Sequence, residues 1–224
     1  LAAWAGLGYY ARARNLHKTA RIIVAEYGGN FPTDQKTLLT LPGIGRYTAS
    51  AIMVMGYGRP GVVVDGNIER VMSRFFAIKT PFPKAKKDIA AAYEQCRPKA
   101  RPSDFPQALM DIANAVCTPR APGCRICPLA NECVGYANDI AEQLPFKALN
   151  GQKPTRRGVA FVAINQNGEA FLERRPNQGL LGGMLAFPSV GWTQRDWSDA
   201  DVQAADSEAP FVANWRQLPE PVHH

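Results

Sequence analysis

Four cysteines, Cys117, Cys124, Cys127 and Cys133, lie close together in the pattern C-x6-C-x2-C-x5-C. Grouped thiols can form disulfides, bind one structural zinc ion or hold an iron–sulfur cluster. A disulfide framework is disfavoured because the chain shows no secretory pattern and its fifth cysteine, Cys96, would be left over. Zinc sites usually combine two C-x2-C pairs, and this segment has a single pair. The spacing therefore favours a [4Fe–4S] cluster over zinc, and we expect Cys96 to be a structural thiol.

Two short motifs upstream of the cysteines also combine glycine with groups that can do chemistry. In Leu41-Pro-Gly-Ile-Gly45 the glycines allow a close backbone approach just before an expected helix, whose N–H groups and dipole suit a phosphate. The alternative is an ordinary corner between two helices. In Val64-Asp65-Gly66-Asn67 the carboxylate is a catalytic candidate, although an Asp-Gly pair is more often a turn.

Helical spacing of apolar residues surrounds these motifs. It predicts helices over 12–27, 46–55, 67–77, 84–95 and 104–116, with no convincing strand alternation among them. Both glycine motifs fall at expected helix starts, and the cysteines follow the last helix. We therefore expect a mainly helical domain over 1–140 that contains a cysteine module at 117–133.

The pattern changes after residue 140. Proline, glycine and charged residues over 141–157 indicate a linker. A period of two then predicts a strand over 158–164, a turn over 165–168 and a returning strand over 170–173. Residues 193–209 are acidic and expected to be partly helical. This region, 158–224, is interpreted as a second, smaller α/β domain.

Charge separates the two parts of the chain. The net charge of +7 arises from 26 Lys and Arg against 19 Asp and Glu. Residues 1–140 carry 18 basic and 10 acidic side chains, and residues 141–224 carry 8 and 9. A basic helical domain favours a polyanionic partner such as nucleic acid, the alternative being a merely soluble basic surface. No apolar run is long enough for a transmembrane helix.

Together, the cysteine spacing, the 41–45 motif and the 64–67 motif resemble the endonuclease III superfamily of DNA glycosylases. The block Gly6-Leu-Gly-Tyr-Tyr10-Ala-Arg-Ala-Arg14-Asn-Leu16 and the added C-terminal region make the chain similar to the adenine DNA glycosylases, or MutY family, within it. The resemblance covers essentially the whole chain. It implies a helix-hairpin-helix glycosylase domain with a [4Fe–4S] module, followed by a partial Nudix-like domain.

The implied activity is base excision repair. A member of this family would remove adenine mispaired with 8-oxoguanine or guanine from double-stranded DNA, as a monomer in the bacterial cytoplasm associated with the nucleoid, with a monovalent cation possible at the hairpin turn. Two alternatives stay open: a non-catalytic DNA-binding fragment, and a glycosylase of the same superfamily with another base specificity.

The resemblance assigns three residues to catalysis. Asp65 would stabilise the oxocarbenium-like sugar cation formed when the glycosidic bond breaks, and Asn67 would support the sugar and this carboxylate. Tyr47 stands where bifunctional relatives carry a Schiff-base lysine. Because a phenol cannot form an imine, we expect a monofunctional glycosylase that uses water as the final nucleophile.

The resemblance also assigns DNA contacts. Tyr9 would act as the wedge that holds open the gap left by the flipped base. The remaining candidates lie in glycine turns or carry a guanidinium: Arg12, Arg14, Gly43, Gly45, Arg46 and Arg120.

The sequence departs from the family at both ends, and a smaller departure is Ala113, where the family often has glycine. The family's general-acid glutamate lies upstream of Gly6, so we expect this chain to be inactive on its own, with Leu16 and Ile23 exposed. The C-terminal region carries the family's Arg174-Arg175-Pro176 and 179–183 segments but lacks a metal-binding R-E-x-x-E-E helix, so it would read 8-oxoguanine without hydrolysing a nucleotide. The chain ends at His223-His224, before the family's lesion-reading loop.

Overall fold

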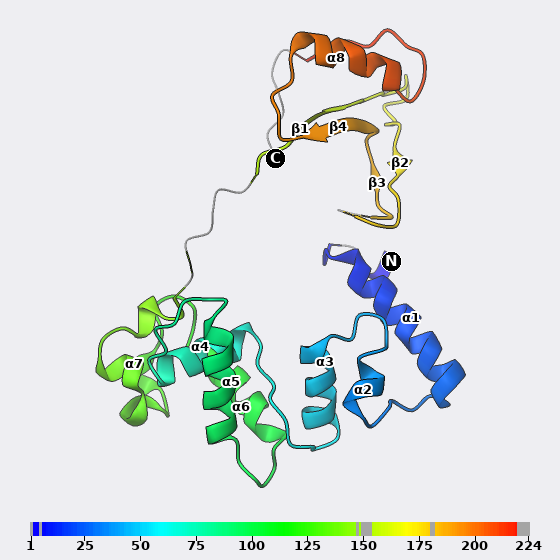
Figure 1. The fold of residues 1–224 in the computed structure, drawn as a ribbon. Helices are drawn as coiled ribbons and strands as arrows, with labels where there is room; N and C mark the ends of the chain where they lie inside the picture. The colour runs from blue at the N-terminus through cyan, green and yellow to red at the C-terminus, as the bar shows by residue number, and fades with distance from the viewer. Residues whose placement is uncertain (1, 5, 147, 149–153, 180–181, 219–224) are drawn as a thin grey trace. The chain divides into compact units, whose positions relative to one another are not determined.

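The structure is a computed structural model that describes every residue except 1, 5, 147, 149–153, 180–181 and 219–224 (Figure 1). The chain divides into two compact units. One is Arg14–Asn150, and the other joins Leu1–Ala13 to Gly151–His224. Part of the expected 141–157 linker, residues 180–181 of the 179–183 segment, and the two terminal histidines lie outside the described residues, and the expected domain boundaries stay a prediction.

The expected helices are confirmed. In chain order they are α1 (Tyr10–Tyr27), α2 (Gln35–Leu38), α3 (Arg46–Ala51) with a π-helical continuation (Ile52–Gly56), α4 (Gly66–Phe75), α5 (Ala85–Cys96), α6 (Asp104–Ala115) and α7 (Val134–Ala137). The mainly helical fold expected for residues 1–140 is therefore present. Among the described helices, none combines the length and the apolar character needed to cross a membrane.

Helix α4 lies at the centre of the main core. Its apolar stripe buries Ile68, Val71 and Met72, each 3% exposed or less. They join one buried cluster with Tyr93 of α5 and Leu109 of α6. Burying a large apolar side chain contributes about 1.5–3 kcal/mol. This packing fixes the direction of α4 and with it the polar residues on its other face.

A smaller core joins α1 to the segment that follows it. Ile23 of α1 packs with Leu38, Leu41 and Ala49 and is only 3% exposed, so the expectation that Ile23 would be exposed is wrong. The Ile23 side chain packs against residues of α2, α3 and the turn between them. The sequence pattern alone did not predict that these segments lie beside α1. Leu16, on another face of α1, is 61% exposed, as expected.

The second unit contains two short antiparallel pairs of strands. In the first, β1 (Arg157–Ala160) pairs with β4 (Ser189–Thr193), and in the second, β2 (Glu173–Arg174) pairs with β3 (Leu185–Ala186). The expected hairpin around 165–168 is confirmed by a bridge between Ile164 and Ala170. The regular strand ends at Ala160, earlier than expected. Beyond Ala160, the Pro188 carbonyl accepts a hydrogen bond from the Phe161 N–H, but Pro188 has no N–H with which to continue the ladder.

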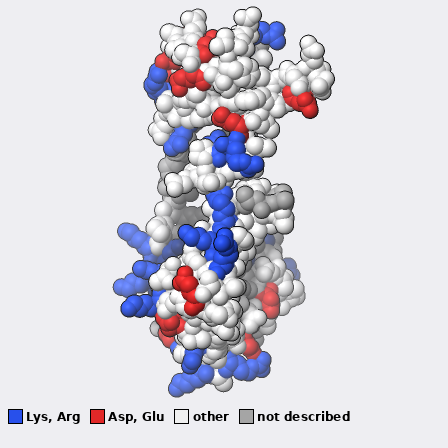
Figure 2. Space-filling view, turned by 90° about the vertical axis from the view of Figure 1, so that its right-hand side faces the viewer, with Lys and Arg blue, Asp and Glu red and all other residues white. Residues whose placement is uncertain are grey.

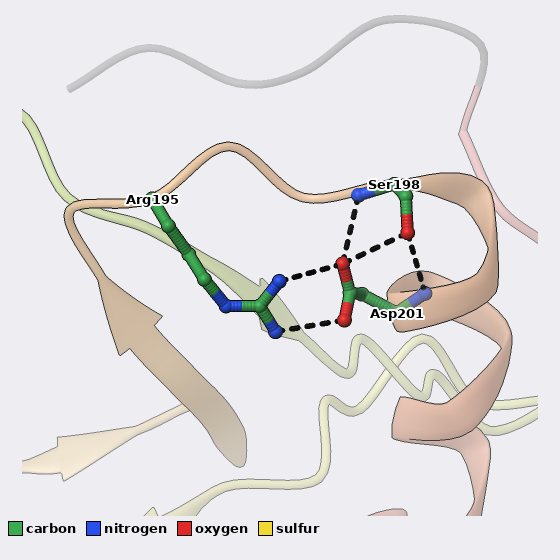
Figure 3. A network of polar contacts seen from close by, with 3 residues as sticks. All are labelled: Arg195, Ser198 and Asp201. Atoms are coloured by element: carbon green, nitrogen blue, oxygen red, sulfur yellow. Dashed lines mark hydrogen bonds and ion pairs between the residues drawn. The ribbon is translucent and has the colours of Figure 1, made fainter.

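Helix α8 (Asp199–Ala205) begins in a charged cap (Figure 3). Ser198 and Asp201 form a capping box, in which the Ser198 hydroxyl accepts from the Asp201 N–H and the Asp201 carboxylate accepts from the Ser198 N–H. The same carboxylate accepts two hydrogen bonds from Arg195, at 2.7 and 2.8 Å. These contacts with Arg195 first, and with Ser198 second, hold the pKa of Asp201 well below its usual range.

This cap generates a prediction about acid stability. Because the pKa of Asp201 is lowered on folding, its stabilising effect is present above the unfolded pKa of about 3.9 and is lost as the pH falls below that value toward the folded pKa. We expect Asp201→Asn to lower the thermal stability of α8 at pH 7 and to flatten its pH dependence between about pH 4 and 2. Amide exchange within 199–205 measures both effects.

Asp199→Asn is the matched control, since it removes one carboxylate from the same helical turn but is outside the Arg195 network. Equal losses of protection in the two variants would show that general charge, and not the cap, stabilises α8.

Candidate functional site

Asp65 caps the N-terminus of α4. Its Oδ1 accepts from the backbone N–H groups of Asn67 and Ile68, at 3.0 and 2.8 Å. Its Oδ2 accepts from the Asn67 side-chain amide at 3.2 Å. The carboxylate is half-buried and stands at the N-terminus of α4, where the positive end of the helix dipole lies. Asp65 is therefore both the turn residue that Asp-Gly pairs usually supply and a fixed, oriented anion.

Arg70 connects this carboxylate to the cysteine segment. Its Nη2 donates to the Asn67 side-chain oxygen at 3.2 Å and to the Ala113 carbonyl at 2.9 Å. Its Nε donates to the Cys117 carbonyl at 2.8 Å. A continuous chain of hydrogen bonds thus runs from Asp65 through Asn67 and Arg70 to the first cysteine of the module.

Tyr47 lies within electrostatic reach of Asp65. Partial burial raises the pKa of the Tyr47 phenol, and the negative charge of Asp65 raises it further. The phenol is therefore neutral at neutral pH, with 44% of the residue exposed. The structure brings all three residues expected to be catalytic, Tyr47, Asp65 and Asn67, into one neighbourhood.

The 41–45 motif forms the turn between α2 and α3. The Ile44 N–H donates to the Leu41 carbonyl, and Gly45 is the N-cap of α3. Gly43 has φ +76°, and a Cβ at this position would lie 2.7 Å from the Cβ of Asn15. The turn therefore packs tightly on α1 and leaves Gly43, Gly45 and Arg46 exposed.

The four grouped cysteines border one cavity of ≈ 30 Å³. None of them is in a disulfide, and Cys96, at the end of α5, is not among the lining residues. Within the described part of the chain, no three His, Cys, Asp or Glu side chains are grouped as a metal ion would need. The site thus combines four free thiols around one space without the tight grouping of a single-ion site.

Burial raises the pKa of the Cys124 thiol, and the neighbouring cysteines raise it further, while the charge of Arg74 opposes them. Several thiolates in one cavity repel one another, so the fully deprotonated set needs positive charge between or beside the sulfurs.

The loop between the first two cysteines is exposed and carries Arg120. The Thr118 hydroxyl donates to the Arg120 carbonyl at 2.9 Å, and the Ala121 N–H donates to the Glu142 carboxylate at 2.8 Å. Ala121 has φ +45°, a left-handed conformation that these contacts maintain. Lys and Arg side chains project in groups from the helical part of the molecule (Figure 2). Arg120 and Arg46 are both exposed.

Two of the expected DNA-contact residues, Tyr9 and Arg12, belong to the other unit. Tyr9 is 81% exposed and has φ +47°, which is uncommon for a residue with a large side chain. The Arg12 guanidinium lies over the Trp4 ring, 5.8 Å from its centroid. Arg14 opens the helical unit, where it is partly buried.

Arg70 and Arg74 were missed by the sequence analysis. A signal was available, since they stand four residues apart on α4 and neither has an acidic residue three or four positions away. Exposed helical arginines are commonly paired in that way, so two without such partners indicate contacts outside the helix.

A family model described as HhH-GPD superfamily base excision DNA repair protein matches residues 1–98. Among curated proteins, the chain is 34% identical to the adenine DNA glycosylase of Buchnera aphidicola subsp. Baizongia pistaciae over 86% of this chain and 57% of that protein. It is 34% identical to the Homo sapiens adenine DNA glycosylase over 84% of this chain and 43% of that protein. The chain thus spans about half the length of these relatives.

Among solved structures, the chain is similar to a trapped covalent intermediate of endonuclease III with DNA and to a non-covalent endonuclease III–DNA complex. Each comparison has a TM-score of 0.50 and 27% identity, and covers 60% of this chain and 62% of the other. The helical fold expected from the sequence is confirmed by these similarities.

The close approach at the turn generates a stability prediction. Gly43→Ala should lower the free energy of unfolding by about 1–3 kcal/mol, because alanine disfavours this positive φ and its Cβ would collide with Asn15. Chemical denaturation provides the measurement. Gly56→Ala is the control, since no atom lies within 4 Å of its added Cβ. Equal stabilities of the two variants would rule out the tight packing of the turn on α1.

Proposed function

The chain belongs to the HhH-GPD superfamily of base excision DNA repair proteins, and its curated relatives are adenine DNA glycosylases. From this premise we propose that it forms the core of an enzyme that removes adenine mispaired with 8-oxoguanine or guanine. The observation that carries the proposal is the anchored carboxylate of Asp65 at the start of α4. The cleaved bond is the N-glycosidic bond between adenine and deoxyribose.

The chemistry follows from the charge that develops on the sugar. As the glycosidic bond breaks, the ring becomes oxocarbenium-like, and a fixed carboxylate beside it stabilises that cation. The contacts of Asp65 hold the carboxylate before the sugar arrives, so little reorganisation is needed. Asn67 is the residue that binds both the carboxylate and Arg70, and it keeps Oδ2 oriented.

Water is the proposed final nucleophile. The negative charge of Asp65 acts on the Tyr47 phenol, and a phenol cannot form an imine with the opened sugar. The proposed enzyme is therefore monofunctional, with Tyr47 packed beside the extruded nucleotide.

DNA binding is proposed to use the exposed hairpin turn and the basic loop. Gly43 and Gly45 permit a close phosphate approach, while Arg46 and Arg120 supply charge. A monovalent cation bound at the turn would add further positive charge for the phosphate. The strained, exposed backbone at Tyr9 supports its role as the inserted wedge, because such outliers concentrate at functional sites. The endonuclease III structures similar to this chain are themselves complexes with DNA.

We propose that Cys117, Cys124, Cys127 and Cys133 hold a [4Fe–4S] cluster. Each cysteine in such a site binds a different iron, so the sulfurs surround a shared space without meeting at one point. Four free thiols around one cavity fit that requirement. Bound there, the cofactor would supply structural support for the 118–123 loop. Residues 158–224 are proposed as a partial Nudix-like domain that reads the 8-oxoguanine opposite adenine.

Asp65→Asn tests the catalytic proposal in the full-length protein. Asparagine is as good an N-cap as aspartate, so stability should be kept, and the phosphate contacts are unchanged, so DNA affinity should be kept too. Single-turnover excision of adenine opposite 8-oxoguanine should fall by at least about 10²-fold, because the negative charge facing the sugar cation is lost.

Asp111→Asn is the matched control, as it removes an exposed carboxylate from α6. Near-normal excision by Asp65→Asn would show that Asp65 is only a helix cap. Binding without excision in the wild-type protein would favour a non-catalytic DNA-binding role, and excision of a different base would favour another specificity within the superfamily.

Metal analysis tests the proposed cofactor. Protein purified without air should be brown and contain about four irons per chain. Cys124→Ser should abolish the colour because it removes one thiolate from the cavity, whereas Cys96→Ser, outside the cavity, should leave it unchanged. One zinc and no iron in the wild type would contradict the assignment.

A further inference from the structure

Arg74 is a fully buried guanidinium in the last turn of α4. The residue is 2% exposed and borders the cysteine cavity. Its Nη1 lies 3.3 Å from the Cys117 sulfur and donates to the Thr118 carbonyl at 2.7 Å. Its Nη2 donates to the Pro119 carbonyl at 3.2 Å, and its Nε donates to the Leu144 carbonyl at 3.1 Å. Four contacts therefore fix one cation against the module.

Among the residues that the structure describes, no carboxylate pairs with the charge of Arg74. A buried charge is costly unless it is paired and hydrogen-bonded. The ionisable groups that line the cavity with Arg74 are the four cysteines and Tyr136, and the thiolate is the form of cysteine that binds metal. Arg74 is thus placed to balance negative charge at the cysteines.

The same guanidinium shapes the basic loop. The carbonyls of Thr118 and Pro119 directly precede Arg120, so the position of Arg74 sets where the loop leaves Cys117. Gly135 of α7 packs directly on the Arg74 backbone, where any Cβ would collide with its carbonyl oxygen. The Cys133 sulfur lies 3.6 Å from that oxygen. The first and last cysteines of the module therefore both contact Arg74.

We propose that Arg74 is a positioning residue that couples the charge at the four cysteines to the shape of the DNA-contact loop 118–123. The inference rests on the proposed iron–sulfur cofactor. Reduction of the proposed cluster by one electron would add a negative charge. The buried Arg74 cation and its hydrogen bond to the Cys117 sulfur would stabilise that reduced cluster and raise its reduction potential. Since the loop presents Arg120, the same cation also strengthens DNA binding.

The experiment compares Arg74→Met and Arg74→Lys with the wild-type chain. Voltammetry measures the reduction potential, and titration with duplex DNA at several salt concentrations measures the affinity. Arg74→Met should lower the potential and weaken DNA binding. Arg74→Lys keeps the charge but not the planar set of donors, so its potential should stay near that of the wild type while its DNA affinity falls several-fold.

Two variants serve as controls. Arg120→Gln should weaken DNA binding and reduce the slope of log affinity against log salt concentration by about 1, because it removes a phosphate contact. It should leave the reduction potential of the cluster unchanged. Arg101→Gln removes an exposed arginine, 85% accessible and paired with Asp104, and should change neither quantity.

The outcomes separate the inference from its premise. Wild-type protein that contains zinc or no metal would overturn the cofactor and the inference together. Wild-type protein with four irons, combined with an unchanged potential in folded Arg74→Met, would overturn the inference alone. If Arg74→Met does not fold, Arg74→Lys decides: wild-type DNA affinity in this variant would overturn the inference, because Arg74 would then not set the loop. Weakened affinity at an unchanged potential would support it, because the potential would follow the retained charge and the loop would follow the lost donors.

Discussion

The site depends on helix α4, whose polar face makes contacts at three successive positions along its length. The N-terminus of α4 holds Asp65, its second turn places Arg70, and its last turn places Arg74. The opposite face is fixed by buried Ile68, Val71 and Met72. Because the apolar stripe sets the rotation of the helix, both arginines turn toward the segment that begins at Cys117. Packing in the core thereby aligns the anion and the cysteine module.

The polar contacts explain why Arg74, which is buried, and Arg70, which is half-buried, are tolerated at this interface. Segments without regular secondary structure, such as 117–123, leave carbonyl groups that need donors. Arg70 and Arg74 supply donors to four such carbonyls, at Cys117, Thr118, Pro119 and Leu144, and to the Ala113 carbonyl in the last turn of α6. Apolar residues of the same size would fill the space but leave these oxygens unsatisfied, at a cost of about 1–3 kcal/mol each. The arginines therefore order a loop that lacks its own hydrogen-bonding pattern.

Local patterns in the sequence predicted the elements, and they failed where contacts between distant segments decide the outcome. The 67–77 helix and its apolar face were predictable, because the period of apolar residues is a local property. The Asp65 motif was also recognisable. The burial of Ile23 was not, because it depends on Leu38, Leu41 and Ala49 lying against α1. Arg70 and Arg74 were missed for the same reason, since their backbone carbonyl acceptors lie more than 40 residues further along the chain.

The two roles of Asp65 are compatible because they use different oxygens. Oδ1 accepts both backbone N–H groups of the cap, and those bonds would form in any helix that begins with aspartate. Oδ2 accepts only from the Asn67 amide among the described contacts, and a carboxylate oxygen has room for a further partner. Asn67 is in turn held by Arg70, which is held by Ala113 and Cys117. A helix cap alone needs none of this support, so the chain of contacts behind Oδ2 supports the proposed role of Asp65 beside the sugar.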